Sequence, residues 1–278
     1  MRFSLVHPSR GRPDLAKAAG REWRSASSGV SEIEHLLSVD DDDPALSAYR
    51  VTTESLGATL VSGPNRSLVE AANRAAAQAT GDILIVVSDD FGCPKDWDAS
   101  LALHFKSRRD IAVLVNDGLG ARVLTLPIVG RELYLRLGYV YHPSYHGMFV
   151  DDDLTETARA MNALVDARSL LFPHRHFTIG ESSLDATYLR HNQPSSWWTG
   201  WRTFQKRRLA GFGVIAPDPE VNAASARVDT YVRLRVAGSI VRRLWSAHLP
   251  VRLVSSEQRL RNWVLRTLER WLKLSAPI

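Results

Sequence analysis

Residues 83–87 form an unbroken aliphatic run, Ile-Leu-Ile-Val-Val, and two aspartates follow it after a single serine. A run without polar alternation is typical of a parallel strand that is buried on both faces. Ligands of open α/β sheets bind beyond the carboxyl ends of such strands. Two adjacent carboxylates repel each other unless a cation or solvent relieves the repulsion. Asp89 and Asp90 therefore predict a Mn²⁺ or Mg²⁺ site at a sheet edge, with a solvated turn as the alternative.

The turn and capping signals around this run predict alternating strands and helices. Ser67 and Glu70 form a capping box at the start of one helix, and Gly81 ends it. The alternation indicates an α/β fold with a mostly parallel sheet flanked by helices. Strands are expected over 2–6, 34–39, 58–61, 83–87, 111–115, 124–129 and 169–172, and helices over 14–27, 67–80, 96–105, 131–137 and 155–164.

The charge of the chain is unevenly distributed. The whole chain of 278 residues carries a net charge of +5, but residues 202–278 hold 15 Lys and Arg and only 5 Asp and Glu. Pro217 and Pro219 suggest a linker, and residues 228–245 and 256–274 have the pattern of basic amphipathic helices. We expect a catalytic domain over 1–215 and a basic α-helical extension over 216–278, which either is a solvated face or binds an anionic partner.

The cellular setting follows from what the chain lacks. The single cysteine, Cys93, excludes an intrachain disulfide and argues against a cysteine-based zinc site. No apolar segment approaches the roughly 20 residues that span a bilayer. The chain is expected to be cytoplasmic, either freely or with a peripheral membrane contact through its basic C-terminal helices.

Further polar residues follow other predicted elements. Asp40 comes at the end of a strand and could accept hydrogen bonds from a ribose or base, whereas residues 41–43 are expected mainly on the surface. The triplet 151–153 could supply a general base and a helix cap. His174 and His176 point to the same face of an extended segment, so one of them could ligate the metal.

In this order the pieces resemble family-2-like nucleotide-sugar glycosyltransferases of the GT-A fold, over roughly residues 1–200. The turn Val6-His7-Pro8-Ser9-Arg10 looks like the family's nucleotide cradle. The segment 73–82, Asn-Arg-Ala-Ala-Ala-Gln-Ala-Thr-Gly-Asp, is similar to the Asn-containing helix before its metal strand. Ser88-Asp89-Asp90 resembles the DXD motif, although a serine stands where a first acid often does.

The resemblance implies a role for each matching residue. Nucleotide or substrate binding falls to Pro8, Ser9, Arg10, Asp40, Asn73 and Asp89, and metal binding to Asp90 and His176, with His174 as the alternative. Residues 150–154 resemble the family's later acidic motif, which supplies the base of inverting members, although an Asp run replaces its Glu-Asp pair. Asp151 is the first choice for this base and Asp152 the second. The partners implied are a UDP-, GDP- or TDP-linked sugar and a carbohydrate or other hydroxyl acceptor.

Two other functions fit parts of the sequence. A nucleotidyltransferase also combines a parallel sheet, a nucleotide and a metal, but it would release pyrophosphate. A non-catalytic module could use its basic tail to bind an anionic surface. No recognised nucleic-acid motif is present, so no nucleic-acid partner is expected.

Overall fold

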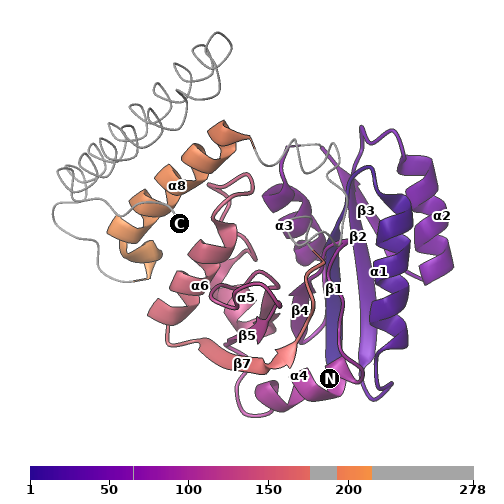
Figure 1. The fold of residues 1–278 in the computed structure, drawn as a ribbon, viewed down its shortest axis with the longest axis horizontal. Coiled ribbons are helices and arrows are strands. Elements are labelled where there is room, and N and C mark those ends of the chain that lie inside the picture. The colour runs from indigo at the N-terminus through magenta and orange to yellow at the C-terminus, as the bar shows by residue number, and fades with distance from the viewer. Residues whose placement is uncertain (65, 176–192, 215–278) are drawn as a thin grey trace, which may run out of the picture. The chain divides into compact units, whose positions relative to one another are not determined.

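The computed structural model describes residues 1–64, 66–175 and 193–214 (Figure 1). The chain divides into two units, Met1–His191 and Asn192–Ile278. His176 and the predicted helices over 228–245 and 256–274 lie outside the described residues.

The first unit is built on a seven-stranded sheet of order β3-β2-β1-β4-β6-β5-β7. Neighbouring strands pair in parallel except at β6, which runs antiparallel to both β4 and β5. The predicted mostly parallel α/β sheet is therefore confirmed. The strands are β1 (Arg2–Pro8), β2 (Glu32–Asp40), β3 (Thr59–Gly63), β4 (Ile83–Val86), β5 (Ala112–Asn116), β6 (Ile128–Gly130) and β7 (Leu164–Leu171).

Helices cover both faces of the sheet. Phe3 of β1 packs edge-on against Trp97, which in turn contacts Trp23, so their helices share one face. Leu114 of β5 lies in a second apolar cluster with Leu133 and helix α6 on the other face. The first face carries α1 (Pro13–Ser25), α2 (Leu46–Leu56) and α4 (Trp97–Ala102), and the second carries α3 (Leu68–Gln78), α5 (Arg131–Leu137) and α6 (Val150–Ala160).

The structure differs from the sequence prediction at several elements, β6 and β7 among them. Helix α2 was not expected, because its sequence is rich in β-branched and polar residues and lacks a side-chain cap. Helix α6 begins at Val150 rather than at residue 155, so the whole acidic triplet lies in its first turn, where the helix dipole favours negative charge. Residue 164, expected in that helix, instead opens β7.

The second unit is described only over residues 193–214. It contains α8 (Pro194–Leu209) and a short 3₁₀ turn, Gly211–Gly213. Among the described helices, none has the length and apolar character needed to cross a bilayer. The domain boundary expected between 215 and 216 stays a prediction.

Candidate active site

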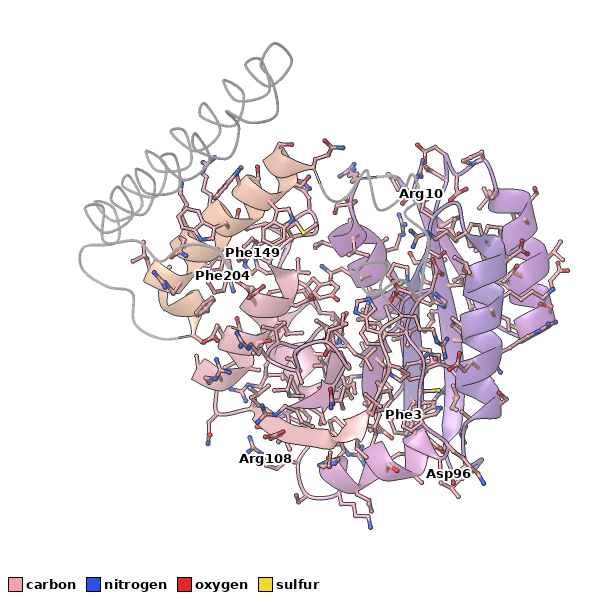
Figure 2. The ribbon with its side chains drawn as sticks, in the orientation of Figure 1. Phe3, Arg10, Asp96, Arg108, Phe149 and Phe204 are labelled. Carbon is pink, nitrogen blue, oxygen red and sulfur yellow. The ribbon has the colours of Figure 1, made fainter. Side chains whose placement is uncertain are left out.

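The carboxyl ends of β1, β2 and β4 meet at one edge of the sheet because these strands are parallel. In Figure 2, Arg10 marks this edge, while Phe3, at the start of β1, lies toward the opposite end with Asp96. Phe149, which precedes α6, lies toward the same end as Arg10. The predicted site residues beside Arg10 therefore lie at this edge, in strand ends and the loops that follow them, whereas Asn73 belongs to α3 and the acidic triplet to the first turn of α6.

Asp89 is held by the protein on both of its carboxylate oxygens. Its Oδ1 lies 3.0 Å from Nε2 of His7, and its Oδ2 accepts a hydrogen bond from the Ser9 hydroxyl at 2.9 Å. The side chain is only 6% exposed. Ser9 also lies 2.7 Å from the hydroxyl of Tyr49, and Pro8 ends β1 beside it. Both Asp89 and Ser9 thus turn toward the protein, although the sequence assigned them to nucleotide binding.

Asp90 points to a different neighbour. One of its oxygens accepts a hydrogen bond from Ser88, and the other lies 3.4 Å from Nε2 of His174. The imidazole of His174 stacks on Phe91 with ring centroids 4.2 Å apart. The structure therefore brings His174 to Asp90, whereas the preferred candidate, His176, lies outside the described residues.

Residues 172–175 form an extended segment between two loops of the site. On one side the amide of His174 donates to the carbonyl of Asp117 at 2.9 Å. On the other side the amide of Arg175 donates to the carbonyl of Asp90 at 2.8 Å. The segment is thus tied by its backbone both to the loop after β4 and to the loop after β5, and this double attachment places the His174 imidazole.

An ion pair and a glycine complete this attachment. Arg175 donates to both carboxylate oxygens of Glu22 in α1, at 2.8 and 2.6 Å. A Cβ on Gly92 would lie 2.7 Å from the Arg175 guanidinium, 2.8 Å from Glu22 and 3.0 Å from Pro173. A side chain at position 92 would therefore force the Arg175–Glu22 ion pair to shift and would crowd Pro173 of the segment.

The pair formed by Asp90 and His174 fits a divalent ion. Two neighbouring ligand atoms of an octahedral ion with bonds of about 2.1 Å lie roughly 3 Å apart, close to the observed separation. An imidazole ligand favours a transition ion such as Mn²⁺ over Mg²⁺. Within the described ranges no group of three or more His, Cys, Asp or Glu side chains converges.

Asp40 lies at the end of β2 between two arginines. Arg10 donates to its Oδ2 at 2.9 Å and to Asp42 at 2.6 Å, and Arg74 of α3 approaches its Oδ1 at 3.5 Å. The hydrogen bond that Arg10 donates to Asp42, and to a lesser extent the one that it donates to Asp40, raise the pKa of Arg10. Arg74 was not singled out from the sequence, although Asn73, the preceding residue of segment 73–82, was. The three side chains of Asp40, Arg10 and Arg74 offer both donors and acceptors to a polar ligand.

One residue of the run 41–43 is not a surface residue as expected. Asp43 is 4% exposed and accepts hydrogen bonds from the amides of Gly11 and Ala45, both at 2.8 Å. Its carboxylate ties the turn after β1 to the segment that leads into α2. The expectation of a solvated loop was wrong at this position because backbone amides satisfy the buried carboxylate.

Asn73 has a role different from the one expected. Its Oδ1 accepts hydrogen bonds from the amides of Val140 and Tyr141, both at 3.0 Å. Its Nδ2 donates to the carbonyl of Tyr141 at 2.6 Å. The amide therefore holds the backbone of residues 140–141, and the predicted nucleotide contact gains no support from this geometry.

The acidic triplet divides into residues with different environments. Burial, followed by the charge of Asp152, raises the pKa of Asp151 to about 8, although a hydrogen bond with Tyr141 opposes the shift. Burial also raises the pKa of Asp152. Both side chains keep partial exposure. A carboxylate with a pKa near the working pH is suited to accept a proton, so Asp151 has the properties expected of a general base.

The third member, Asp153, serves the fold. It is 1% exposed and accepts a hydrogen bond from the Tyr145 hydroxyl at 2.9 Å. Thr157, one turn further along α6, lies 3.4 Å from its other oxygen. Asp153 thus fixes the helix to the loop before it.

Sequence reasoning missed two residues close to Asp151. Tyr141 is buried and hydrogen-bonds to Asp151. Asp117 follows β5, and its carboxylate accepts hydrogen bonds from three amides of residues 119–121 and from Thr125. Burial alone would raise the pKa of Asp117, but these hydrogen bonds lower it. Its position directly after a strand was the available signal.

Comparison with known proteins agrees with this architecture. Residues 34–132 match the family model described as Glycosyl transferase family 2. This match and the fold confirm the resemblance to family-2-like glycosyltransferases and identify the chain as a glycosyltransferase with a GT-A fold. No curated protein matches the chain.

Several solved structures share the fold at low sequence identity. A mannosyltransferase from Pyrobaculum calidifontis, in complex with GDP-Man and Mn²⁺, has a TM-score of 0.54 and 16% identity, over 98% of this chain and 84% of that one. Glucosyl-3-phosphoglycerate synthase from Mycobacterium tuberculosis, with Mn²⁺, UDP and its product, has a TM-score of 0.53 and 16% identity, over 78% and 81%. S. aureus TarS 1-349 with UDP-GlcNAc has a TM-score of 0.54 and 14% identity, over 82% and 70%.

Proposed function

We propose that the protein is a metal-dependent, inverting glycosyltransferase that moves a sugar from a nucleotide-sugar donor to an acceptor hydroxyl. The observation that carries the proposal is the approach of Asp90 and His174 at the carboxyl end of β4. The solved structures with GDP-Man and Mn²⁺, with UDP and Mn²⁺, and with UDP-GlcNAc support the same chemistry by analogy of fold.

The donor would lie along the edge formed by the ends of β1, β2 and β4. Arg10, Asp40 and Arg74 would contact its nucleoside, because they surround the end of β2 with fixed donors and acceptors. Asp90 and His174 would hold a divalent ion, which neutralises the charge that develops on the leaving diphosphate. His174 takes the place proposed for His176 because its contact with Asp90 is described.

Asp151 would act as the base toward the acceptor. Its carboxylate would take the proton of the acceptor hydroxyl as that oxygen attacks the anomeric carbon, and direct displacement would invert the configuration. The neighbouring negative charge of Asp152 raises the pKa of Asp151 and so strengthens it as a base. Asp152 itself is the alternative base.

Nucleotide release from UDP-, GDP- and TDP-sugars, with and without Mn²⁺, tests this proposal. We expect Mn²⁺-dependent release by the wild type, a loss of at least tenfold in Asp90→Asn and a larger loss in Asp151→Asn. Release that is independent of metal and unchanged in Asp90→Asn would contradict metal catalysis. Formation of pyrophosphate from a nucleoside triphosphate would instead favour a nucleotidyltransferase.

The membrane contact proposed for the basic extension depends on residues 216–278, outside the described part of the chain. Pelleting of the full chain with anionic vesicles, compared with a chain ending at residue 215, tests it. Equal pelleting of both chains would contradict a role for the extension. The cytoplasmic location likewise stays a prediction.

A further inference from the structure

Two buried histidines lie directly behind the proposed metal-binding turn. His7 on β1 is fully buried, and His35 on β2 is 2% exposed. Their rings stack at 5.3 Å, because the parallel pairing of β1 and β2 places them diagonally on the same face. Nδ1 of His7 lies 3.1 Å from Nε2 of His35, and Nε2 of His7 lies 3.0 Å from Asp89. The chemistry proposed above uses neither ring.

The hydrogen bonds of this row have one direction when both rings are neutral. An ionised carboxylate can only accept, so His7 donates its Nε2–H to Asp89. The Nδ1 of His7 then carries a lone pair and accepts from Nε2–H of His35. Burial, the largest cause, lowers the pKa of His35, which favours its neutral form. With both rings neutral, the row therefore allows only one tautomer for each ring.

A second row of hydrogen bonds reaches the other oxygen of Asp89. The backbone amide of Arg12 can only donate, and it donates to the Tyr49 hydroxyl at 2.8 Å. That hydroxyl then donates to Ser9, which donates to Oδ2 of Asp89. His7 of β1 and Ser9, directly after β1, thus each donate to one oxygen of the Asp89 carboxylate. Behind them stand His35 of β2 and Tyr49 of α2.

We propose that His7 and His35 are positioning residues for the metal site: they hold the Asp89 carboxylate in one orientation and so fix the turn that presents Asp90. This inference rests on the proposed function and adds residues to it. Asp89 precedes Asp90 in the chain, so the hydrogen bonds that anchor its side chain also restrain the backbone from which Asp90 projects. Removing a group that hydrogen-bonds directly to a metal ligand typically lowers metal affinity 10–100-fold, and His7, which acts through the neighbouring Asp89, is expected at the lower end of that range.

A matched pair of variants tests the role of His7. The amide nitrogen of glutamine can occupy the place of imidazole Nε2, whereas that of asparagine can reach only the place of Nδ1. We expect His7→Asn to weaken Mn²⁺ binding about tenfold. In His7→Gln, which restores the donor to Asp89, the affinity should stay within about threefold of wild type.

Binding is measured by Mn²⁺ electron paramagnetic resonance, with the metal alone and with UDP or GDP, and the melting temperature of each variant reports folding. His35→Leu provides a second variant if His7→Asn does not fold. It removes the donor to His7 with a side chain of similar size, and we expect it to weaken Mn²⁺ binding several-fold. If His7→Asn and His35→Leu both fold and bind Mn²⁺ with wild-type affinity, this inference is overturned while the proposed function stands.

Nitrogen NMR of the metal-free protein gives a readout that does not depend on activity. We expect a proton on Nε2 of His7, where it donates to Asp89. An Nε2 of His7 without a proton would overturn the proposed arrangement. Absence of Mn²⁺ binding by the wild type, with or without nucleotide, would overturn the metal-dependent function and this inference together.

Discussion

The variant Asp152→Asn separates the two aspartates proposed for the base. The pKa of Asp151 is raised to about 8 by burial and then by the charge of Asp152. Asparagine keeps the size of the side chain and removes its charge. Because burial is the larger cause of the shift, we expect the loss of this charge to lower the pKa of Asp151 by only about one unit, or about 1.4 kcal/mol.

The size of the kinetic effect follows from this shift. At pH 6.5 a group of pKa 8 is ionised to about 3%, and one of pKa 7 to about 24%, so the active fraction rises roughly eightfold. The weaker basicity of the shifted carboxylate offsets part of this gain. We therefore expect kcat/KM of Asp152→Asn to exceed that of the wild type several-fold at pH 6.5 and to be equal or lower at pH 9.

The assay is nucleotide release at limiting donor and acceptor between pH 5.5 and 9.5, since kcat/KM reports groups of the free enzyme. Asp153 provides no comparable control, because its carboxylate is buried in hydrogen bonds. Glu156→Gln serves as the control instead. The charge of Glu156 raises the pKa of Asp152 but is not among the causes of the Asp151 shift, so we expect little change in the pH profile of this variant. Loss of activity at every pH in Asp152→Asn would identify Asp152 as the base. If the acidic limb of the kcat/KM profile of Asp152→Asn lies at the same pH as in the wild type, the electrostatic reasoning is refuted.

Three further substitutions test the supports of the site. Gly92→Ala should weaken Mn²⁺ binding several-fold, because a Cβ there collides with the segment that carries His174, while Gly120→Ala, with no atom within 4 Å of the added Cβ, should not. His174→Ala should weaken Mn²⁺ binding more than His176→Ala, and the reverse order would restore His176 as the ligand. Asn73→Ala should lower the free energy of unfolding by roughly 1–3 kcal/mol, measured by urea, and an unchanged stability would contradict its backbone contacts.

The sequence predicted the sheet well where its signals are local. The aliphatic run before Asp89 is buried as β4, and the helix with the Ser67 and Glu70 capping box forms as α3, with the Glu70 amide donating to Ser67 at 3.1 Å. These features depend on residues close together in the chain. Helix α2 has no such signal, and it was missed because its stability comes from packing, for instance of Tyr49 against β2.

The candidate site was predicted as a set of residues but not as a set of contacts. Asp89, Asp90 and Asp151 could be recognised because each follows or begins an element. The partners of Asp89 lie about 80 residues away in the chain, at His7 and Ser9, and no local pattern reports them. The choice between His174 and His176 likewise depends on which one the backbone of segment 172–175 aims at Asp90.

Similar carboxylates at one sheet edge differ because their nearest hydrogen-bond donors differ. Asp117 receives four donors and has a lowered pKa, which suits a group that orders a loop. Asp151 receives a hydrogen bond from Tyr141 but lies beside another carboxylate, and its pKa is raised. Burial acts in the same direction on both, so it cannot account for the difference. The number of donors that the backbone supplies, rather than depth in the protein, therefore decides which aspartate stays a fixed anion and which one is able to take up a proton.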